Sequence, residues 1–301
     1  MNVLMGSKEI GDYLLQFGNY SLQNHQTLLM ADPSNFEVAY AINPHMKDEN
    51  GNLKKVDRAK AITQWESLKE LYQELGIRVL ILPTLPEAPD LVFTANSMLP
   101  FFEPGSQKLR LLPSVMFSEF RKAEVKHAAH FLEGAGYQVL SQFDGDIMEG
   151  NGDVLAFPRA PLFIAGYGFR TKQKSLQRVS ELTGHAVVPL QLVSDQFYHL
   201  DTCLSVLSKD TVAIVKEAFD EPSLQRIQVL FPRIIEISNQ EAIEAFAGNC
   251  FCPDGKNVVL QAGADEFEKK LRDEGFRCLP VETSEFMKSG GSVFCLKLGL
   301  H

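Results

Sequence analysis

Residues 57–83, DRAKAITQWESLKELYQELGIRVLILP, contain the pattern that decides the fold. Apolar side chains recur at helical spacing from Ile62 to Leu75, and Asp57 is placed to cap the first turn. Gly76 ends the helix, and the run IRVLILP that follows is typical of a buried β-strand. This stretch therefore predicts one helix followed by one strand.

The same succession of helix, stop and strand recurs along the rest of the chain. The strands that close these units start near residues 77, 137, 186, 233 and 276, so the period is about fifty residues. Further β-like runs separate each such strand from the next helix. They are LVFTANSML (91–99), DVLAFP (153–158), CLSVLSKDTVAIV (203–215) and CFCPDGKNVVLQAG (250–263). The chain thus predicts about five units of two strands, a helix and a third strand.

A regular period of this length favours a ring or stack of repeats over two unrelated domains. A doubly wound α/β fold also alternates strands and helices, but it would carry a glycine-rich turn after its first strand. No such turn occurs here, and no linker is long enough to separate two domains. We expect a single domain spanning residues 1–301, with residues 1–35 as an N-terminal extension or lid.

Composition narrows the class of protein. The chain has 301 residues, of which 45% are hydrophobic and 22% charged, so it can build a large core and is not disordered. Its net charge of −9 leaves no basic surplus for nucleic acid. Five cysteines without a CxxC pair favour a reducing compartment, and no apolar run has membrane-spanning length. We expect a cytoplasmic protein with no nucleic-acid or membrane partner; the sequence leaves open whether it forms a homo-oligomer.

Two patterns that would suggest a cofactor are incomplete. GNG (150–152) and GYG (166–168) do not extend to GxGxxG, and neither lies between a strand and a helix in the expected way. Cys250 and Cys252 form a CxC pair, but no second pair of His or Cys completes a tetrahedral site. The sequence therefore predicts neither a nucleotide cofactor nor a metal.

Four segments place polar or ionisable groups within apolar stretches: PDLVFTAN (89–96), DIMEGNGDVL (146–155), FYHLDTCLSVL (197–207) and SGGSVFCLKL (289–298). On a strand, His199 and Asp201 would point to the same face because side chains alternate. Each segment belongs to a different repeat, so a ring would bring them together at its centre. Taken singly, each has an ordinary structural explanation: Cys295 as a buried apolar residue, His199 as a core histidine, and Glu149 as a turn residue.

In combination, the segments resemble the guanidine-modifying superfamily, which includes arginine deiminases, arginine dihydrolases, dimethylarginine dimethylaminohydrolases and amidinotransferases. The resemblance rests on PDLVFTAN, MEGNGDVL, GYGFRT, HLDT and GGSVFC, which occur in the family's order, and it extends to residues 43–298 when NPHM is included. It implies a five-bladed α/β propeller, or pentein, of pseudo-symmetric ββαβ repeats. That fold agrees with the period of about fifty residues.

The chemistry of a guanidinium group explains why such residues belong together. The group is planar, cationic and resonance-stabilised, so its carbon is a poor electrophile. Carboxylates can hold its N–H edges by paired hydrogen bonds and place the carbon for attack. A cysteine thiolate can then add to that carbon, and a histidine can protonate the departing amine and afterwards activate water.

The resemblance assigns a role to individual acids and to the nucleophile. Cys295 is the expected nucleophile, His199 the general acid and base, and Glu149 the carboxylate that grips the guanidinium and orients the histidine. Asp201 is expected to bind the guanidinium beside Glu149. Asp90 is expected to lie in the same cavity.

The resemblance also assigns substrate-binding residues outside these acids. Arg170, in GYGFRT, corresponds to an arginine that holds the substrate carboxylate, and Arg121 resembles another. The alternative for both is an ordinary surface arginine. Asn96 stands where deiminases usually carry an aspartate, and FTAN resembles the dihydrolase branch. Two further departures are Phe294, where His or Arg is usual before the nucleophile, and Asn151, which is inserted into an EGGD-like motif.

These observations predict a hydrolase acting on C–N bonds of linear amidines, with no cofactor. Asn96 favours an arginine dihydrolase-like activity that yields ornithine, ammonia and carbon dioxide. The alternatives are a dimethylarginine dimethylaminohydrolase, which yields citrulline and an alkylamine, and a catalytically silent binding protein on the same fold. Arginine or a derivative is the expected small-molecule substrate.

Overall fold

The computed structural model describes residues 2–18, 20–21, 26–106, 108–141 and 143–300. Its helices are α1 (Ser7–Leu14), α2 (Arg58–Glu74), α3 (Lys122–Gly134), α4 (Gly150–Asp153), α5 (Gln173–Thr183), α6 (Glu221–Leu230), α7 (Asn239–Glu244), α8 (Asp265–Asp273) and α9 (Ser284–Met287). Its strands are β1 (Thr27–Ala31), β2 (Arg78–Leu82), β3 (Met98–Phe102), β4 (Leu109–Pro113), β5 (Val154–Ala156), β6 (Leu162–Tyr167), β7 (Ala186–Gln191), β8 (Leu204–Val206), β9 (Thr211–Ile214), β10 (Arg233–Glu236), β11 (Asn257–Gln261), β12 (Arg277–Val281) and β13 (Leu298–Gly299).

Over these residues the strands form five small sheets that share one pattern. Three sheets, β13–β1–β2, β5–β6–β7 and β8–β9–β10, each have an antiparallel pair followed by a parallel pair. In the sheet β3–β4 the parallel partner is a single bridge between Leu111 and Val139. In β11–β12 the antiparallel partner is a single bridge between Phe251 and Val259. Each helix α2, α3, α5, α6 and α8 precedes the parallel partner, as the repeat predicts.

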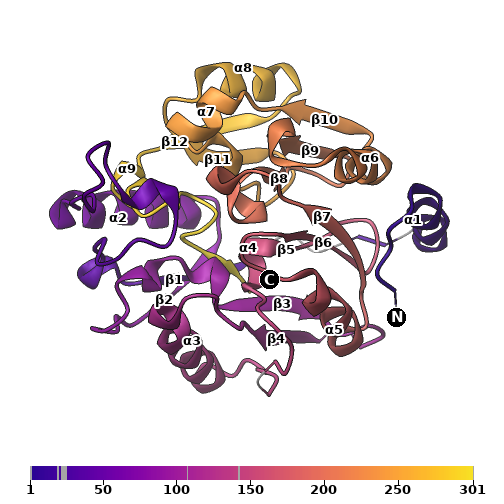
Figure 1. The fold of residues 1–301 in the computed structure, drawn as a ribbon, viewed down its shortest axis with the longest axis horizontal. Coiled ribbons are helices and arrows are strands. Elements are labelled where there is room, and N and C mark those ends of the chain that lie inside the picture. The colour runs from indigo at the N-terminus through magenta and orange to yellow at the C-terminus, as the bar shows by residue number, and fades with distance from the viewer. Residues whose placement is uncertain (1, 19, 22–25, 107, 142, 301) are drawn as a thin grey trace.

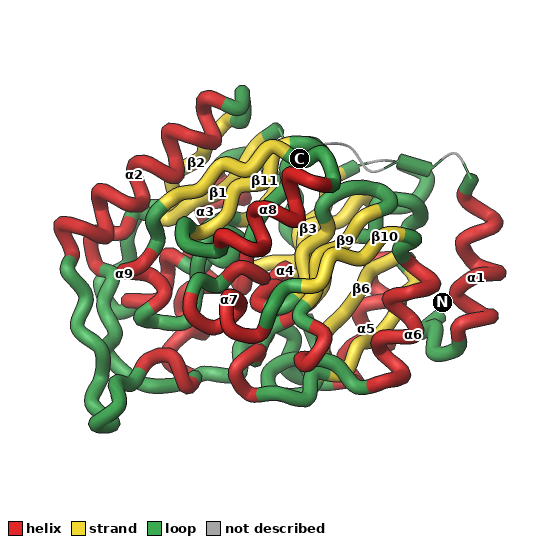
Figure 2. The backbone as a smooth tube through the Cα atoms, turned by 90° about the horizontal axis from the view of Figure 1, so that it is seen from above, coloured by secondary structure: helices red, strands yellow, loops and turns green. Residues whose placement is uncertain are grey.

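The five long helices lie on the outside of the molecule and the sheets lie inside them (Figure 1). Figure 2 shows the strands at the middle of the molecule, flanked by helices. The buried face of α2, which includes Trp65, Leu68 and Tyr72, packs in a cluster that also contains Cys295. The apolar face that the helical spacing predicts is therefore the face that α2 buries, and it packs next to the candidate nucleophile.

Three predicted extended segments take another form. Pro89–Val92 and Thr94–Asn96 are 3₁₀ turns, and β3 begins only at Met98, so LVFTANSML is not a strand throughout. Leu200–Thr202 is also a 3₁₀ turn, and the strand argument for His199 and Asp201 is wrong. YQVLSQF forms no strand among its described residues, only the bridge at Val139. In the 3₁₀ turns at Thr94–Asn96 and Leu200–Thr202, hydrogen bonds between side chains and the backbone replace ladder bonds.

The first and last parts of the chain meet in one sheet. β1 is the central strand of β13–β1–β2, so the last strand of the chain pairs with the first. Of the predicted extension over residues 1–35, residues 1, 19 and 22–25 lie outside the described residues, β1 is built into this sheet, and α1 packs at the periphery against α6 (Figure 1).

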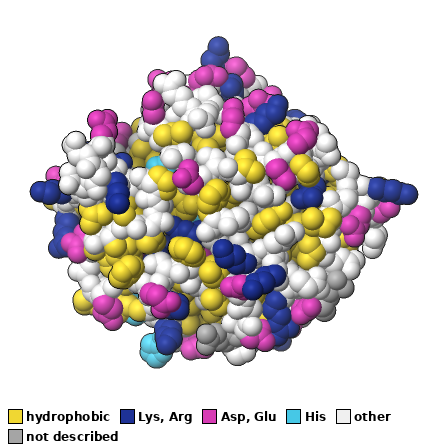
Figure 3. All heavy atoms as spheres, in the orientation of Figure 1, with side chains coloured by type: hydrophobic (Ala, Val, Ile, Leu, Met, Phe, Trp, Pro, Cys, Tyr) yellow, Lys and Arg dark blue, Asp and Glu magenta, His cyan; other side chains and the backbone are white. Residues whose placement is uncertain are grey.

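The surface carries charges of both signs. On the face shown in Figure 3, acidic and basic side chains are interspersed with apolar ones. Among the described residues, no helix combines the length and apolar content that crossing a bilayer requires.

Candidate active site

The segments singled out in the sequence meet at one small cavity. Six of the predicted site residues line it: Asp90, Asn96, Arg121, Arg170, His199 and Cys295. The other two, Glu149 and Asp201, are fully buried and contact His199 and Cys295 directly. Residues from four different sheet units are therefore brought together, as the repeat predicts.

Cys295 lies in a turn and not in a strand. The turn is closed by the Leu296 N–H, which donates to the Ser292 carbonyl at 3.1 Å. The Cys295 Sγ donates to Asp201 Oδ2 at 3.2 Å and accepts from Asn249 Nδ2 at 3.1 Å. Burial raises the pKa of this thiol well above its ordinary range, and the Asp201 carboxylate raises it further. The thiol is therefore protonated in the free protein at neutral pH, and a cation bound beside Asp201 would favour its ionisation.

The contact between these two residues predicts the pH dependence of thiol reactivity. Since Asp201 raises the pKa of the Cys295 thiol, Asp201→Asn is expected to lower that pKa. The rate of alkylation of Cys295 by iodoacetamide, measured against pH, should then rise at lower pH than in the unchanged protein. Asp195→Asn is the matched control, because Asp195 is an exposed aspartate six residues before Asp201. An unmoved alkylation profile in Asp201→Asn would contradict the assignment.

Glu149 connects a histidine and an arginine inside the protein. Its Oε2 lies 2.5 Å from His199 Nε2 and accepts from Arg170 Nη1 at 3.2 Å. Its Oε1 accepts from the Phe117 backbone N–H at 2.7 Å. Burial by itself would raise the pKa of this carboxyl, but the hydrogen bond and charge of His199, with the charges of Arg170 and Arg121, lower it to about 2. Glu149 is therefore an ionised acceptor that fixes the imidazole of His199.

His199 and Asp201 are held in the site by Asp153, a carboxylate of the segment DIMEGNGDVL to which the resemblance assigned no role. Asp153, at the end of α4, accepts from the Leu200 N–H at 3.0 Å and from the Thr171 N–H at 3.3 Å. These two bonds tie HLDT and GYGFRT to the end of the EGNGD turn. Burial raises the pKa of Asp153 above the ordinary value of an aspartate.

Asn96 is oriented by Arg121. The Arg121 Nη1 donates to Asn96 Oδ1 at 3.0 Å, and its Nε and Nη2 are paired with Glu124. A guanidinium can only donate, so the amide oxygen of Asn96 must face it and the amide nitrogen must face away. A Cβ at position 152 would lie only 2.2 Å from this amide nitrogen, so only glycine fits at position 152. In the described part of the chain, Asn96 Nδ2 has no hydrogen-bond partner.

The two predicted substrate-binding arginines are both buried. Arg121 is 3% exposed, and so is Arg170, so the alternative of surface arginines is wrong. Arg170 lies 4.8 Å from the centre of the Tyr198 ring, and its Nη2 donates to the Ile42 carbonyl at 2.7 Å. Arg170 thus links the core of the site to the loop that contains NPHM.

That loop closes the cavity. Asn43 Nδ2 donates to the Ser289 carbonyl at 3.0 Å, and the Ser289 hydroxyl donates to Asp90 Oδ1 at 2.8 Å. Gly290 adopts φ +90°, and a Cβ there would collide with Asn43 and Tyr198. The enclosed volume is about 10 Å³, enough for a single water, so entry of a larger molecule requires the loop to move.

Sequence reasoning missed Asn249, which holds the nucleophile in place. Its Oδ1 accepts from the N–H groups of Ser292, Phe294 and Cys295 at 3.1, 3.1 and 3.2 Å. Its Nδ2 donates to the Asp201 carbonyl at 2.8 Å as well as to the thiol. Nothing in GNC (248–250) signals this, because the contact joins residues 46 positions apart.

The site has no metal-ligand geometry. Across the described residues, no group of three or more His, Cys, Asp or Glu is arranged to hold a metal ion. The described cysteines are all free thiols, Cys250 and Cys252 among them.

Comparison with known proteins agrees with this geometry. Residues 32–301 match the family described as N,N dimethylarginine dimethylhydrolase, eukaryotic. The N(G),N(G)-dimethylarginine dimethylaminohydrolase of Mycobacterium tuberculosis is 36% identical over 90% of this chain and 85% of its own length. The bifunctional arginine dihydrolase/ornithine cyclodeaminase AgrE of Nostoc sp. is 33% identical over 90% of this chain, which corresponds to 37% of that longer protein.

A solved structure is similar over nearly the whole chain. The N-terminal domain of ArgZ bound to product, an arginine dihydrolase from the ornithine–ammonia cycle in Cyanobacteria, superposes with a TM-score of 0.84. It is 29% identical, and the alignment covers 91% of this chain and 97% of that one.

Fold, site and relatives define a member of the guanidine-modifying superfamily, a hydrolase of guanidino C–N bonds with the α/β fold of ArgZ. Within that class, the chain belongs to the family described as N,N dimethylarginine dimethylhydrolase, eukaryotic.

Proposed function

We propose that this protein hydrolyses the guanidinium group of arginine or a close derivative through a covalent thiouronium on Cys295. The observation that carries the proposal is the thiol of Cys295 in contact with Asp201, beside a His199–Glu149 pair, at one cavity. A guanidinium held by Asp201 would place its carbon next to the sulfur and supply the positive charge that favours the thiolate.

The residues divide the chemistry of the first hydrolysis. The Cys295 thiol gives its proton to His199, the sulfur forms a bond to the guanidinium carbon, and the C–N bond to the leaving amine breaks. His199 gives the amine its proton; its Nε2 is held by Glu149, so Nδ1 is the nitrogen that exchanges protons with the substrate. The same imidazole then removes a proton from water, which attacks the thiouronium and releases the thiol.

The ligand contacts are proposed on the same geometry. Arg170 holds the substrate carboxylate when the loop movement that admits substrate frees its Nη2 from the Ile42 carbonyl, and Asp90 closes the cavity through Ser289. Arg121 has its donors engaged by Glu124, Asn96 and backbone carbonyls, so its proposed contribution is to position Asn96.

A second hydrolysis at the same carbon is supported by Asn96. Its amide nitrogen is buried in the site and, in the described residues, unpaired, so it can donate to the oxygen of a ureido group formed by the first hydrolysis. Arginine and two waters would then yield ornithine, two ammonia and carbon dioxide. The likeness to ArgZ, an arginine dihydrolase, supports the same choice.

Asn96→Ser tests this choice. The shorter side chain removes the donor, so the expected result is that citrulline accumulates in place of ornithine while arginine is still consumed, within about tenfold of the original rate. Products are resolved by mass spectrometry. Asn239→Ser, an exposed change on α7, is the control and should still give ornithine. An unchanged ratio of ornithine to citrulline in Asn96→Ser would contradict the role of Asn96.

Dimethylarginine hydrolysis is the second candidate. It is favoured by the family match over residues 32–301 and by the Mycobacterium tuberculosis relative, which is named for that activity. In that case the leaving group is dimethylamine, and the reaction ends at citrulline after one hydrolysis.

One experiment separates the candidates. The protein is incubated with arginine, monomethylarginine and asymmetric dimethylarginine between pH 6 and 9, and the products are identified by mass. Ornithine from arginine selects the dihydrolase, and dimethylamine with citrulline selects the dimethylargininase. If no guanidine compound is consumed at any of these pH values, the remaining alternative is a catalytically silent binding protein.

We also propose that the five sheets are the five blades of a propeller within a single domain. The shared strand pattern and the pairing of β13 with β1 support a closed ring.

The free cysteines support a reducing, cytoplasmic location. A homo-oligomer is open to test by light scattering.

A further inference from the structure

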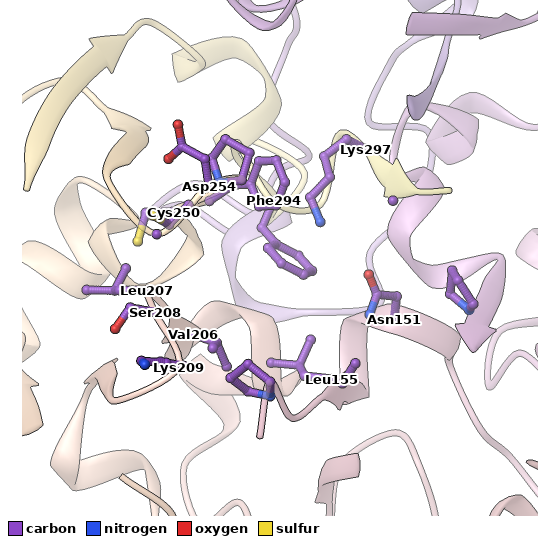
Figure 4. A pocket seen from close by; sticks show the side chains of 18 of the residues that line it. Asn151, Leu155, Val206, Leu207, Ser208, Lys209, Cys250, Asp254, Phe294 and Lys297 are labelled. Carbon is purple, nitrogen blue, oxygen red and sulfur yellow. The ribbon is translucent and has the colours of Figure 1, made fainter. Parts of the chain in front are cut away.

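A second, larger cavity lies behind the nucleophile. Its volume is about 320 Å³, at the lower end of the range for small-molecule sites. Asn151, Leu155, Val206, Phe294 and Lys297 surround it (Figure 4), none of which lines the substrate cavity. The segment 294–297 therefore separates two cavities: Cys295 lines one, whereas Phe294 and Lys297 line the other.

Lys297 is a buried cation at this cavity. The residue is 0% exposed, and its Nζ has no hydrogen-bond partner within the described ranges. The Nζ lies 3.2 Å from the centre of the Phe294 ring and 4.3 Å from that of Phe251. Aromatic rings stabilise an ammonium only in part, so the three N–H donors of a protonated Lys297 call for an acceptor that the described residues do not supply.

The departures from the family motifs converge on the same place. Phe294 and the inserted Asn151 are departures from the family motifs that were noted in the sequence. Neither residue has a role in the proposed hydrolysis of a guanidinium. Both line this cavity, with Lys297 between them in Figure 4. Asn151 is held by its Nδ2, which donates to the Val154 carbonyl at 3.0 Å. The changes thus belong to a single site.

We propose that this cavity binds a small organic carboxylate, whose oxygens pair with Lys297 Nζ once the Phe294 ring that covers it turns aside, and whose apolar part packs against Leu155 and Val206. A cation is disfavoured by Lys297, and the apolar walls disfavour a strongly hydrated anion without a hydrocarbon part. Lys209 and Asp254, both exposed, lie at the mouth and leave it without net charge.

The charges around Lys297 connect this cavity to the nucleophile. Burial lowers the pKa of Lys297 to about 7, against the opposing effects of Asp201 and Cys295. A carboxylate favours the protonated form, so binding is expected to be tighter below about pH 7 and weaker above it. Occupancy would place a full positive charge near Asp201 and Cys295, and the two cavities would be coupled through that charge.

The first test is binding of 3-methylbutanoate, measured by isothermal titration calorimetry at pH 6.5. The neutral amide of the same acid is the matched ligand control and should bind at least about tenfold more weakly. Lys297→Met replaces the cation by an apolar side chain of similar length and is expected to weaken carboxylate binding about tenfold to a hundredfold. Val206→Phe fills the cavity while leaving Lys297 in place, and it should also abolish binding.

The second test observes Lys297 itself. The ¹³Cε signal of Lys297, assigned by its loss in Lys297→Met, is titrated with and without 3-methylbutanoate. The expected result is an upward shift of its midpoint in the presence of the acid. Equal binding by the unchanged protein, Lys297→Met and Val206→Phe, or an unmoved Lys297 midpoint at saturation, would overturn the proposal. Neither outcome depends on turnover, so the proposed hydrolase activity stands or fails separately.

Discussion

Replacing Cys295 by serine is expected to lower kcat for the guanidino substrate by at least about ten-thousand-fold. A serine hydroxyl is far less acidic than a thiol, and beside the Asp201 carboxylate it would stay protonated. No thiouronium could then form. Rapid quench followed by intact-protein mass spectrometry should show a substrate-derived adduct in the unchanged protein and none in Cys295→Ser.

The matched control is Cys278→Ser. Cys278 is half-buried, lies on β12 outside both cavities and donates to the Glu268 carbonyl. Turnover in this variant should stay within about twofold of the original, since an off-site substitution removes no group that touches substrate. Substantial turnover in Cys295→Ser would remove covalent catalysis from the proposal.

Glu149→Gln is expected to have the second-largest effect, a loss in kcat of about a hundredfold to ten-thousandfold. One side of the carboxylate accepts from the Phe117 N–H, so the new amide nitrogen would turn toward Arg170 and His199. Two donors would then face each other, and the imidazole would lose the ionised acceptor that holds it. Steady-state kinetics over pH 6 to 9 measure this change.

The same substitution bears on stability. Because the pKa of Glu149 falls to about 2 in the folded protein from an ordinary 4.5, the carboxylate stabilises the fold above about pH 4.5, and this contribution is lost as the pH falls toward 2. Glu149→Gln should remove that dependence and leave the buried guanidinium of Arg170 without its carboxylate partner, at a cost of about 3–5 kcal/mol in the free energy of unfolding.

Glu119→Gln is the matched control for both measurements. The Glu119 side chain is 80% exposed and pairs with Lys122 on the surface, where such ion pairs contribute little. Its kcat and free energy of unfolding should be unchanged within error. Equal effects of Glu119→Gln and Glu149→Gln would show that the loss of an acid, and not its place beside His199, is responsible.

Local patterns were enough to predict the repeat. Helical spacing with a following stop fixes α2, α3, α5, α6 and α8, and β-branched runs fix the strands after most of them. The exception, YQVLSQF, shows the limit, because whether a short run forms a ladder depends on how much partner strand it meets. The resemblance to known motifs supplied the site residues, and the structure places all eight around one cavity or directly behind it.

The sequence by itself determined the class of protein, because the five units are local patterns and the motifs occur in a recognisable order along the chain. Only the tertiary structure decided that Asp201 lies in a 3₁₀ turn that begins just after His199, that Asn249 holds Cys295, and that Lys297 lines a cavity of its own. The physical reason is that a polar group buried in a fold is positioned by whichever distant donor or acceptor satisfies it. Such partners lie dozens of residues away, as Asn249 does from Cys295, and no periodicity records them.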